Sequence, residues 1–336
     1  MTLAPLSFTK TVKKKQRSFE LPAPAAPLAD THAHLTCFWN KTPAEALARA
    51  ARAGVRSLVT LWDPIADDFD SFPAFRAWLA EQLAAGRERA EREGASLDLF
   101  DNVRFLAGVH PYGALDFMSR EPQVLRQLRE ALLDPLCAGI GEIGLDYHFD
   151  ADDNIEAAPH DVQIACMESQ LALASENGVP VELHLRNDAG DEAREAHADA
   201  SRVLQEHGVP QAGCVLHCFT EDLPTAERFF GLGCYIAFGG AATFRRNEGI
   251  REAFAACPLD RILFETDCPY MAPEPIRGVE CEPAMIGFTA EPMAGNDAGQ
   301  LARRALRVPK IPQPSRGQHT ITRAVCSTKS MPPERV

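Results

Sequence analysis

The sequence predicts an α/β protein of the (β/α)8 TIM barrel class, in which eight parallel strands are enclosed by helices. Short runs rich in Val, Ile and Leu alternate with longer segments of helical periodicity. Eight such runs are present, and most are apolar throughout, as expected for strands buried on both faces of a parallel sheet. Polar side chains suited to catalysis or metal binding follow several of them. The alternation also fits a large doubly wound sheet.

The expected elements follow this rhythm in order. The strands are expected at residues 28–34, 55–62, 103–110, 137–142, 179–184, 213–217, 234–238 and 261–267. The helices are expected at residues 43–53, 72–93, 121–133, 160–177, 191–207, 223–232 and 247–256. Pro43 near the start of the first helix, and Gly54, Gly178 and Gly208 after helix ends, are typical helix boundaries. Residues 63–70 are expected to form an active-site loop.

Composition limits the classes of function. A chain of 336 residues with 46% hydrophobic residues accommodates a barrel of about 250 residues. The net charge of -13 argues against tight, non-specific binding to duplex DNA, but not against an enzyme that takes only a chain end into its site. The sequence has no secretory signal and no apolar run of membrane-spanning length, so we expect a cytoplasmic protein without membrane contact. Its ten cysteines include no Cys-x-x-Cys pair and are expected to be reduced.

The two ends of the chain differ from the middle. Residues 1–27 are basic and then rich in Pro and Ala, which predicts a disordered leader before a barrel domain at residues 28–291. Residues 292–336 form an atypical basic tail, expected to be mostly irregular. Its best helical stretch, residues 297–307, has few large apolar side chains. We therefore expect the eighth strand, and its seam with the first, to lack a proper covering helix, which lowers stability.

The ends of five predicted strands carry side chains typical of metal ligands. On the first strand, His32 and His34 are two residues apart and therefore face the same way. The strand ends of a β/α barrel meet at one mouth, where active sites lie. Four imidazoles and two carboxylates gathered there can hold two divalent cations. The predicted ligands are His32, His34, Glu142, His184, His217 and Asp267.

From about Leu28 to about Glu291, the sequence resembles the TatD family of metal-dependent hydrolases, within the amidohydrolase-like barrels. The motifs that carry the resemblance are DTHAH, GVHP, GEIGLDY, HLR, HCF and LDRILFETDCPYMAP. The resemblance implies that His32 and His34 hold one metal ion while His184 and His217 hold a second. It also implies that Glu142 bridges the two ions and that Asp267 lies at the metal centre, both with catalytic roles.

Other positions carry over less directly. His110 is expected either to line the substrate pocket or to make a structural hydrogen bond. Arg186 is expected either to bind a substrate phosphate or to pair with an acid such as Asp188. The family's Asn-Glu-Pro after the last strand is replaced here by Cys281-Glu282-Pro283, and its final amphipathic helix by the basic tail.

The resemblance implies a deoxyribonuclease that acts as an exonuclease on single-stranded DNA ends. Two divalent ions (Mg, Zn or Mn) would activate a water molecule for attack on the phosphodiester. No obligate protein partner is evident in the sequence. Two alternatives stay open. One is a hydrolase of another ester or amide, such as a lactone, cyclic amide or aminoacyl ester. The other is a non-catalytic binding protein whose barrel is compromised.

Overall fold

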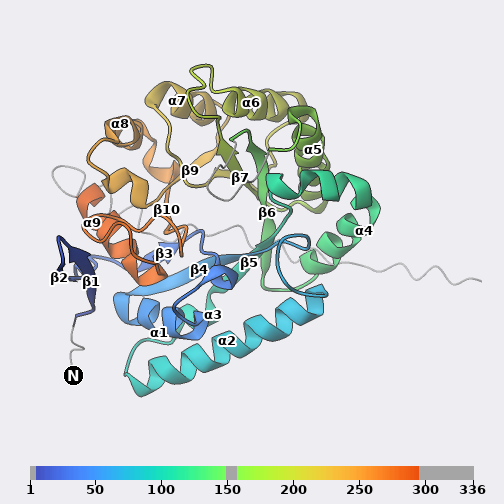
Figure 1. Cartoon of the computed structure of the whole chain (residues 1–336). Coiled ribbons are helices and arrows are strands. Elements are labelled where there is room, and N and C mark those ends of the chain that lie inside the picture. Colours follow the sequence, from blue (N-terminus) through green and yellow to red (C-terminus); the bar gives the residue numbers. More distant parts are fainter. Residues whose placement is uncertain (1–4, 149–156, 295–336) are drawn as a thin grey trace, which may run out of the picture.

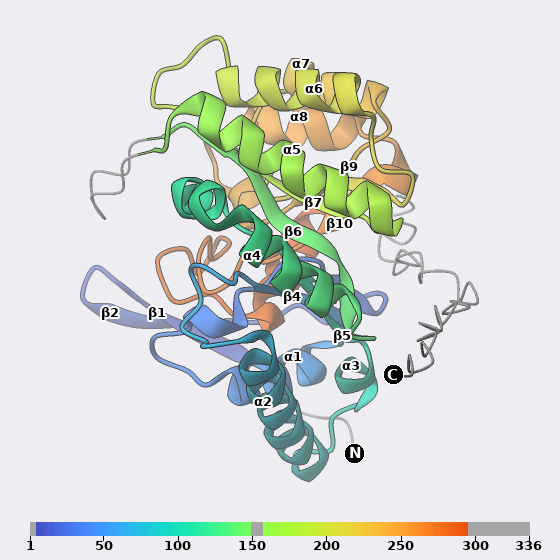
Figure 2. The same cartoon turned by 90° about the vertical axis from the view of Figure 1, so that its right-hand side faces the viewer.

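The computed structural model describes residues 5–148 and 157–294, and its eight parallel strands confirm the predicted barrel class (Figure 1). The sheet runs in the order β10-β9-β8-β7-β6-β5-β4-β3, with helices on its outer side (Figure 2). Each strand overlaps a predicted one. They are β3 (Leu28–Asp30), β4 (Val55–Trp62), β5 (Val103–Ala107), β6 (Cys137–Asp146), β7 (Val181–Arg186), β8 (Cys214–Leu216), β9 (Tyr235–Phe238) and β10 (Ile262–Phe264).

The first and last barrel strands are joined by backbone hydrogen bonds. The Thr31 N–H donates to the Phe264 carbonyl at 3.1 Å. Just beyond the two strands, the Asp267 N–H donates to the carbonyl of His32 at 3.0 Å, and the His34 N–H donates to that of Cys268 at 2.7 Å. The sheet therefore closes on itself, which excludes the doubly wound alternative.

The helices follow the predicted order. Thr42 caps α1, where its side chain accepts a hydrogen bond from the Glu45 N–H, and Gly54 ends that helix with φ 91°. Helix α4 starts earlier than expected because it continues through a non-helical Arg120 ahead of Pro122. None of the described helices is long and apolar enough to cross a membrane. The helices are α1 (Pro43–Ala53), α2 (Phe72–Arg92), α3 (Asp98–Asp101), α4 (Ala114–Leu132), α5 (His160–Asn177), α6 (Glu195–His207), α7 (Leu223–Gly231), α8 (Glu248–Ala256) and α9 (Ile286–Ala294).

The prediction of a disordered leader is wrong for residues 5–27, which the structure describes. Strands β1 (Ser7–Val12) and β2 (Lys15–Glu20) form an antiparallel hairpin, joined by Lys13 and Lys14, both with positive φ. Leu6, Phe8 and Leu21 are buried. The Lys- and Pro-rich composition concealed these few apolar residues, which suffice to dock the hairpin on the barrel.

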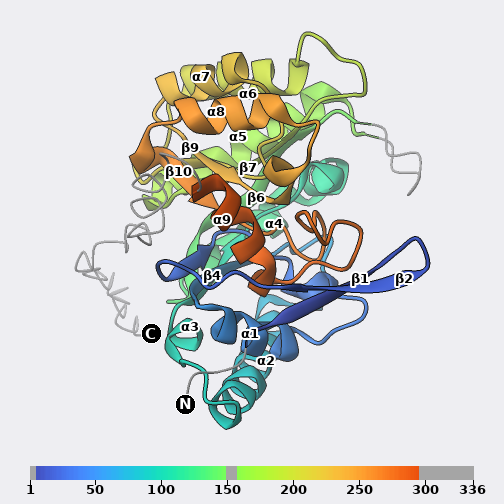
Figure 3. The ribbon, with the colours of Figure 1, turned by 90° about the vertical axis from the view of Figure 1, so that its left-hand side faces the viewer.

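Helix α9 covers the seam that was expected to be poorly protected. It packs against β3 and β10, and Phe288 on it meets Phe8 of the hairpin, with ring centroids 5.7 Å apart. Figure 3 shows the hairpin lying across α9. This helix was not predicted, because Gly287 and Pro292 weaken its helical pattern. The remainder of the predicted tail, from residue 295 onward, lies outside the described residues.

We predict that Phe8→Ala lowers the free energy of unfolding by about 3 kcal/mol, because it removes a buried ring from the contact between hairpin and α9. The measurement is urea denaturation of the full chain. Thr9→Ala, on the exposed face of the same strand, is the control and should change stability little. Equal midpoints for the two variants would show that the hairpin does not stabilise the barrel.

Candidate metal centre

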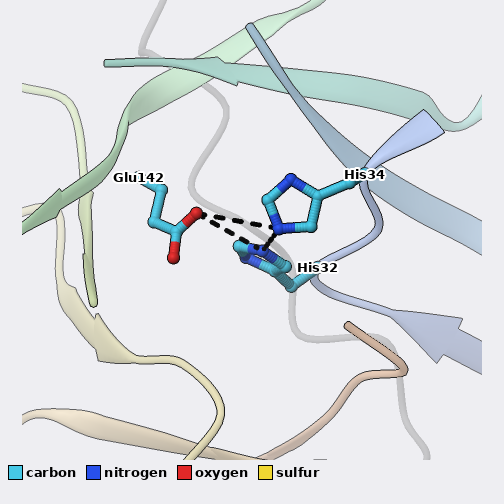
Figure 4. Close-up of side chains that lie close together, drawn as sticks. All are labelled: His32, His34 and Glu142. Atoms are coloured by element: carbon cyan, nitrogen blue, oxygen red, sulfur yellow. Dashed lines mark hydrogen bonds and ion pairs between the residues drawn. The ribbon is translucent and has the colours of Figure 1, made fainter. Parts of the chain in front are cut away.

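Glu142 lies at the middle of the predicted site, 7% exposed and on β6, which continues four residues beyond it. Its Oε1 lies 2.7 Å from His184 Nδ1 and 2.6 Å from His217 Nε2. Its Oε2 lies 3.8 Å from the Nε2 atoms of both His32 and His34 (Figure 4). The two oxygens of one carboxylate thus face two separate pairs of imidazoles.

The first histidine pair comes from the segment after β3. The Nε2 atoms of His32 and His34 are 3.0 Å apart. Asp267 completes this half of the site, with its Oδ1 3.4 Å from His34 Nε2 and 3.8 Å from His32 Nε2. Asp267 adopts a left-handed backbone with φ 54°, and the hydrogen bonds across the seam hold it there.

The second pair comes from β7 and the end of β8. His184 Nδ1 and His217 Nε2 are 3.2 Å apart, both beside Glu142 Oε1. The other nitrogen of His184, Nε2, lies 3.0 Å from Asp146 Oδ2. All six predicted ligands therefore converge on one place, as the sequence led us to expect.

The donor set fits divalent cations. His32 and His184 each contact a carboxylate through the nitrogen directed away from the centre, Glu182 at 2.7 Å and Asp146 at 3.0 Å. Metal-binding histidines are commonly oriented in this way, because the outer carboxylate fixes the ring and its tautomer. The inner nitrogens are thereby directed at Glu142. Among the described residues, the groups able to hold an ion include His32, His34 and Glu142, and also His110, Glu142 and His184.

Burial shapes the protonation of these rings. It lowers the pKa of His32 to about 4 and that of His110 to about 3, so both present a lone pair at neutral pH. Burial also opposes the charged form of His184, but hydrogen bonds to Asp146 and Glu142 outweigh it and raise the pKa of that ring to about 10. A cation that binds His184 Nδ1, the nitrogen beside Glu142, must therefore displace a proton from this ring.

Besides Asp146, two buried carboxylates behind the histidines were absent from the predicted site, Glu182 and Glu265. Glu182 contacts His32, and Glu265 lies with its Oε1 3.7 Å from His217 Nδ1. His217 Nδ1 and Glu265 Oε2 are both buried without a hydrogen-bond partner in the described structure. Each acid precedes a predicted ligand by two residues, in the motifs ELH and ETD. The alternation that paired His32 with His34 could have pointed to them.

The predicted substrate-binding residues lie at the edge of the centre. His110 Nε2 is 3.9 Å from Glu142 Oε1, and its Nδ1 accepts a hydrogen bond from the Tyr112 N–H. Arg186 is about two-fifths exposed, with Nη1 3.9 Å from Asp146 Oδ2. Asp188 was the alternative partner for this arginine, and its Oδ1 lies 3.5 Å from His148 Nδ1.

We predict that Glu182→Ala weakens divalent-metal binding by about 10–100-fold, because His32 loses the group that orients its ring. The measurement is calorimetric titration of the metal-free protein. Glu182→Gln, which keeps an oxygen near Nδ1, should recover part of the affinity. Unchanged affinity in the alanine variant would show that Glu182 does not position His32.

Comparison with known protein families gives a match over most of the chain. The sequence model described as TatD related DNase matches residues 29–302. The chain belongs to this family. The match runs past Glu291, where the resemblance was expected to end. It covers the segments that carry all six converging side chains.

Similar proteins include several named only as hydrolases. The metal-dependent hydrolase YcfH of Escherichia coli is 40% identical over 197 residues, which are 58% of this chain and 66% of that protein, slightly under two thirds of its length. YabD of Bacillus subtilis is 30% identical over 268 residues, covering 80% of this chain and 90% of that one. The protein named 3'-5' ssDNA/RNA exonuclease TatD of Pantoea vagans is 34% identical over 206 residues, covering 59% and 73%.

Among solved structures, the TatD homologue YJJV of Escherichia coli superposes with a TM-score of 0.62 at 28% identity, covering 83% of this chain and 95% of that one. A dihydropyrimidinase from Brevibacillus agri has a TM-score of 0.52 at 13% identity and shares the fold alone.

Proposed function

We propose that the protein is a two-metal phosphodiesterase that acts as an exonuclease on single-stranded DNA ends. The observation that carries this proposal is the position of Glu142, whose two oxygens face two different histidine pairs. The exonuclease name of the Pantoea vagans relative supports the substrate class. The names of the Escherichia coli and Bacillus subtilis relatives support a metal-dependent hydrolase but say nothing of its substrate.

The roles of the residues follow from the geometry. His32, His34 and Asp267 would hold one ion, His184 and His217 the other, and Glu142 both. When bound, the divalent ions supply Lewis-acid activation of water and offset negative charge on the phosphate. The chain must then supply a proton acceptor. Asp267 is the best placed, because it is buried at the centre. Burial raises the pKa of Asp267, but three histidines outweigh this effect and keep that pKa below the ordinary value, so the carboxylate is ionised and able to accept a proton.

Arg186 would bind the phosphate from the rim. Its guanidinium has a fork geometry that matches phosphate oxygens, and it lies on the same strand as His184. His110 would line the pocket beside Glu142 without needing charge, since burial keeps its imidazole neutral. The concentration of positive charge at the centre and at Arg186 would admit a phosphate despite the net charge of -13.

The test is a screen of the metal-free protein reloaded with Mg, Mn or Zn. Single-stranded DNA, a generic phosphodiester and aminoacyl esters are the substrates. We expect metal-dependent cleavage of DNA from its ends and little turnover of the aminoacyl esters. Cleavage of an ester or a cyclic amide with no cleavage of DNA under any metal would overturn the proposal.

A further inference from the structure

The rim beside the first histidine pair carries two exposed aromatic rings. Tyr270, in the segment after β10, lies edge-on to His34 with ring centroids 5.7 Å apart. Trp39, in the segment after β3, lies 6.1 Å from Tyr270 at an interplanar angle of 47°. Trp39 is 58% exposed and Tyr270 47%. The rings form a path from the metal centre to solvent.

Exposed aromatic residues gather at this mouth. In the described part of the chain, the large aromatic side chains that are exposed are Trp39, Tyr112 and Tyr270. Tyr112 lies 4.5 Å from the ring of His110, on the other side of the centre. Tyr112 and Tyr270 each lie against a histidine of the site, and Trp39 is linked to one through Tyr270. Packing of the barrel gives no reason for such a distribution, whereas substrate binding does.

Trp39 is held in place by a buried acid. The backbone N–H groups of Trp39 and Asn40 both donate to Glu280 Oε1, at 2.8 and 2.7 Å. Lys41 Nζ lies 3.1 Å from the other oxygen of Glu280. The Cys281 N–H then donates to the Pro269 carbonyl, which ties this segment to the one that carries Tyr270. These contacts fix the backbone of Trp39, so the segment that carries the ring loses little entropy when a ligand stacks on it.

We propose that Trp39 and Tyr270 form a stacking site for the nucleobase next to the phosphodiester bound at the metal centre. This inference rests on the proposed function and names what the site recognises beyond phosphate. Every base has a flat π-face, so stacking binds single strands with little regard to sequence. An acidic protein gains little from distant phosphates, and stacking supplies affinity that its net charge does not.

The test compares single-stranded oligonucleotides that have either an intact or an abasic terminal nucleotide. For the intact substrate we expect Trp39→Ala to raise KM about 10–100-fold, because stacking contributes roughly 1–3 kcal/mol per base. Trp39→Phe should lie between this variant and the wild type. The preference for the intact over the abasic end should shrink in the alanine variant. The substitution leaves the backbone hydrogen bond to Glu280 in place.

Leu133→Ala is the matched control. Leu133 is 85% exposed and follows α4 at the end of the barrel opposite the mouth, so its loss should leave both KM values unchanged. A second readout needs no turnover. Trp39 is exposed, whereas Trp62 is buried and Trp78 is partly buried. An oligonucleotide added to the metal-free protein should therefore quench tryptophan emission in the wild type, and the quenching should be lost in Trp39→Phe.

The outcomes separate this inference from the proposed function. If the wild type cleaves DNA but Trp39→Ala keeps the same KM and the same preference for intact ends, the stacking site is wrong and the nuclease assignment stands. If the wild type cleaves no DNA but the oligonucleotide quenches Trp39, the stacking site stands and the nuclease assignment falls. Absence of quenching in the wild type overturns the stacking site.

Discussion

Glu142→Ala is expected to abolish turnover and to weaken metal binding at both halves of the site together. Each Glu142 oxygen faces its own histidine pair, so in the proposed two-metal site one substitution would remove a ligand from both ions. Metal ions contribute several kcal/mol to stabilising the transition state, and 1.36 kcal/mol corresponds to a tenfold change in rate. We therefore expect a loss of roughly 10³-fold or more in kcat/KM.

The measurement is steady-state cleavage of single-stranded DNA across a metal titration, with metal content determined by elemental analysis. Glu176→Ala is the matched control, because it removes an exposed carboxylate that lies on α5 and pairs with Arg129 rather than with the histidines. If Glu142→Ala cleaves as fast as the wild type at low metal concentration, the two-metal arrangement is wrong.

Gly144→Ala should destabilise the barrel by about 3 kcal/mol or more and disable the centre. Gly144 lies on β6 between Glu142 and Asp146, with φ 142°, a backbone that residues with a Cβ rarely adopt. A Cβ there would lie 2.1 Å from the carbonyl oxygen of His184 on the neighbouring strand. Because this is backbone, β6 and β7 would have to separate, and Glu142 and His184 with them.

Gly178→Ala separates the two causes. Gly178 also has positive φ, 64°, but a Cβ there meets nothing within 4 Å. It should cost only about 1–2 kcal/mol from the backbone conformation. Thermal or urea unfolding of both variants, with metal titration of each, is the measurement. Equal losses of stability and unchanged metal affinity would show that the close contact with His184 does not matter.

The barrel, and the convergence of the six proposed ligands on one place, were predictable because both follow from simple periodicities. Buried parallel strands are apolar throughout, and the closed sheet brings their ends together, so His32, Glu142 and Asp267 could be placed in one site. Strand ends were less exact: β6 runs to Asp146, and its register shift after Ile140 is not encoded in a hydrophobic pattern. Glu182 escaped notice because an acid inside an apolar strand has a visible role only once His32 is beside it.

The leader, and the cover of the seam between β3 and β10, were misread for a different reason. Composition is averaged over a window, and the window around residues 1–27 is dominated by Lys and Pro. The hairpin docks through three buried apolar side chains, Leu6, Phe8 and Leu21. The ring of Phe8 contacts Phe288, which lies on a helix far away in the sequence. Such a long-range contact leaves no local pattern in either segment.

The seam between β3 and β10 also sets when the metal centre can come into existence. His32 and His34 are made early in synthesis and Asp267 late, yet backbone hydrogen bonds join exactly these segments. On the ribosome, the amino-terminal histidines must wait for more than two hundred further residues before their partner emerges. In the proposed site, an ion held by His32, His34 and Asp267 can therefore bind only after the chain has been made beyond Asp267, and a truncated product that ends before β10 cannot form this half of the site.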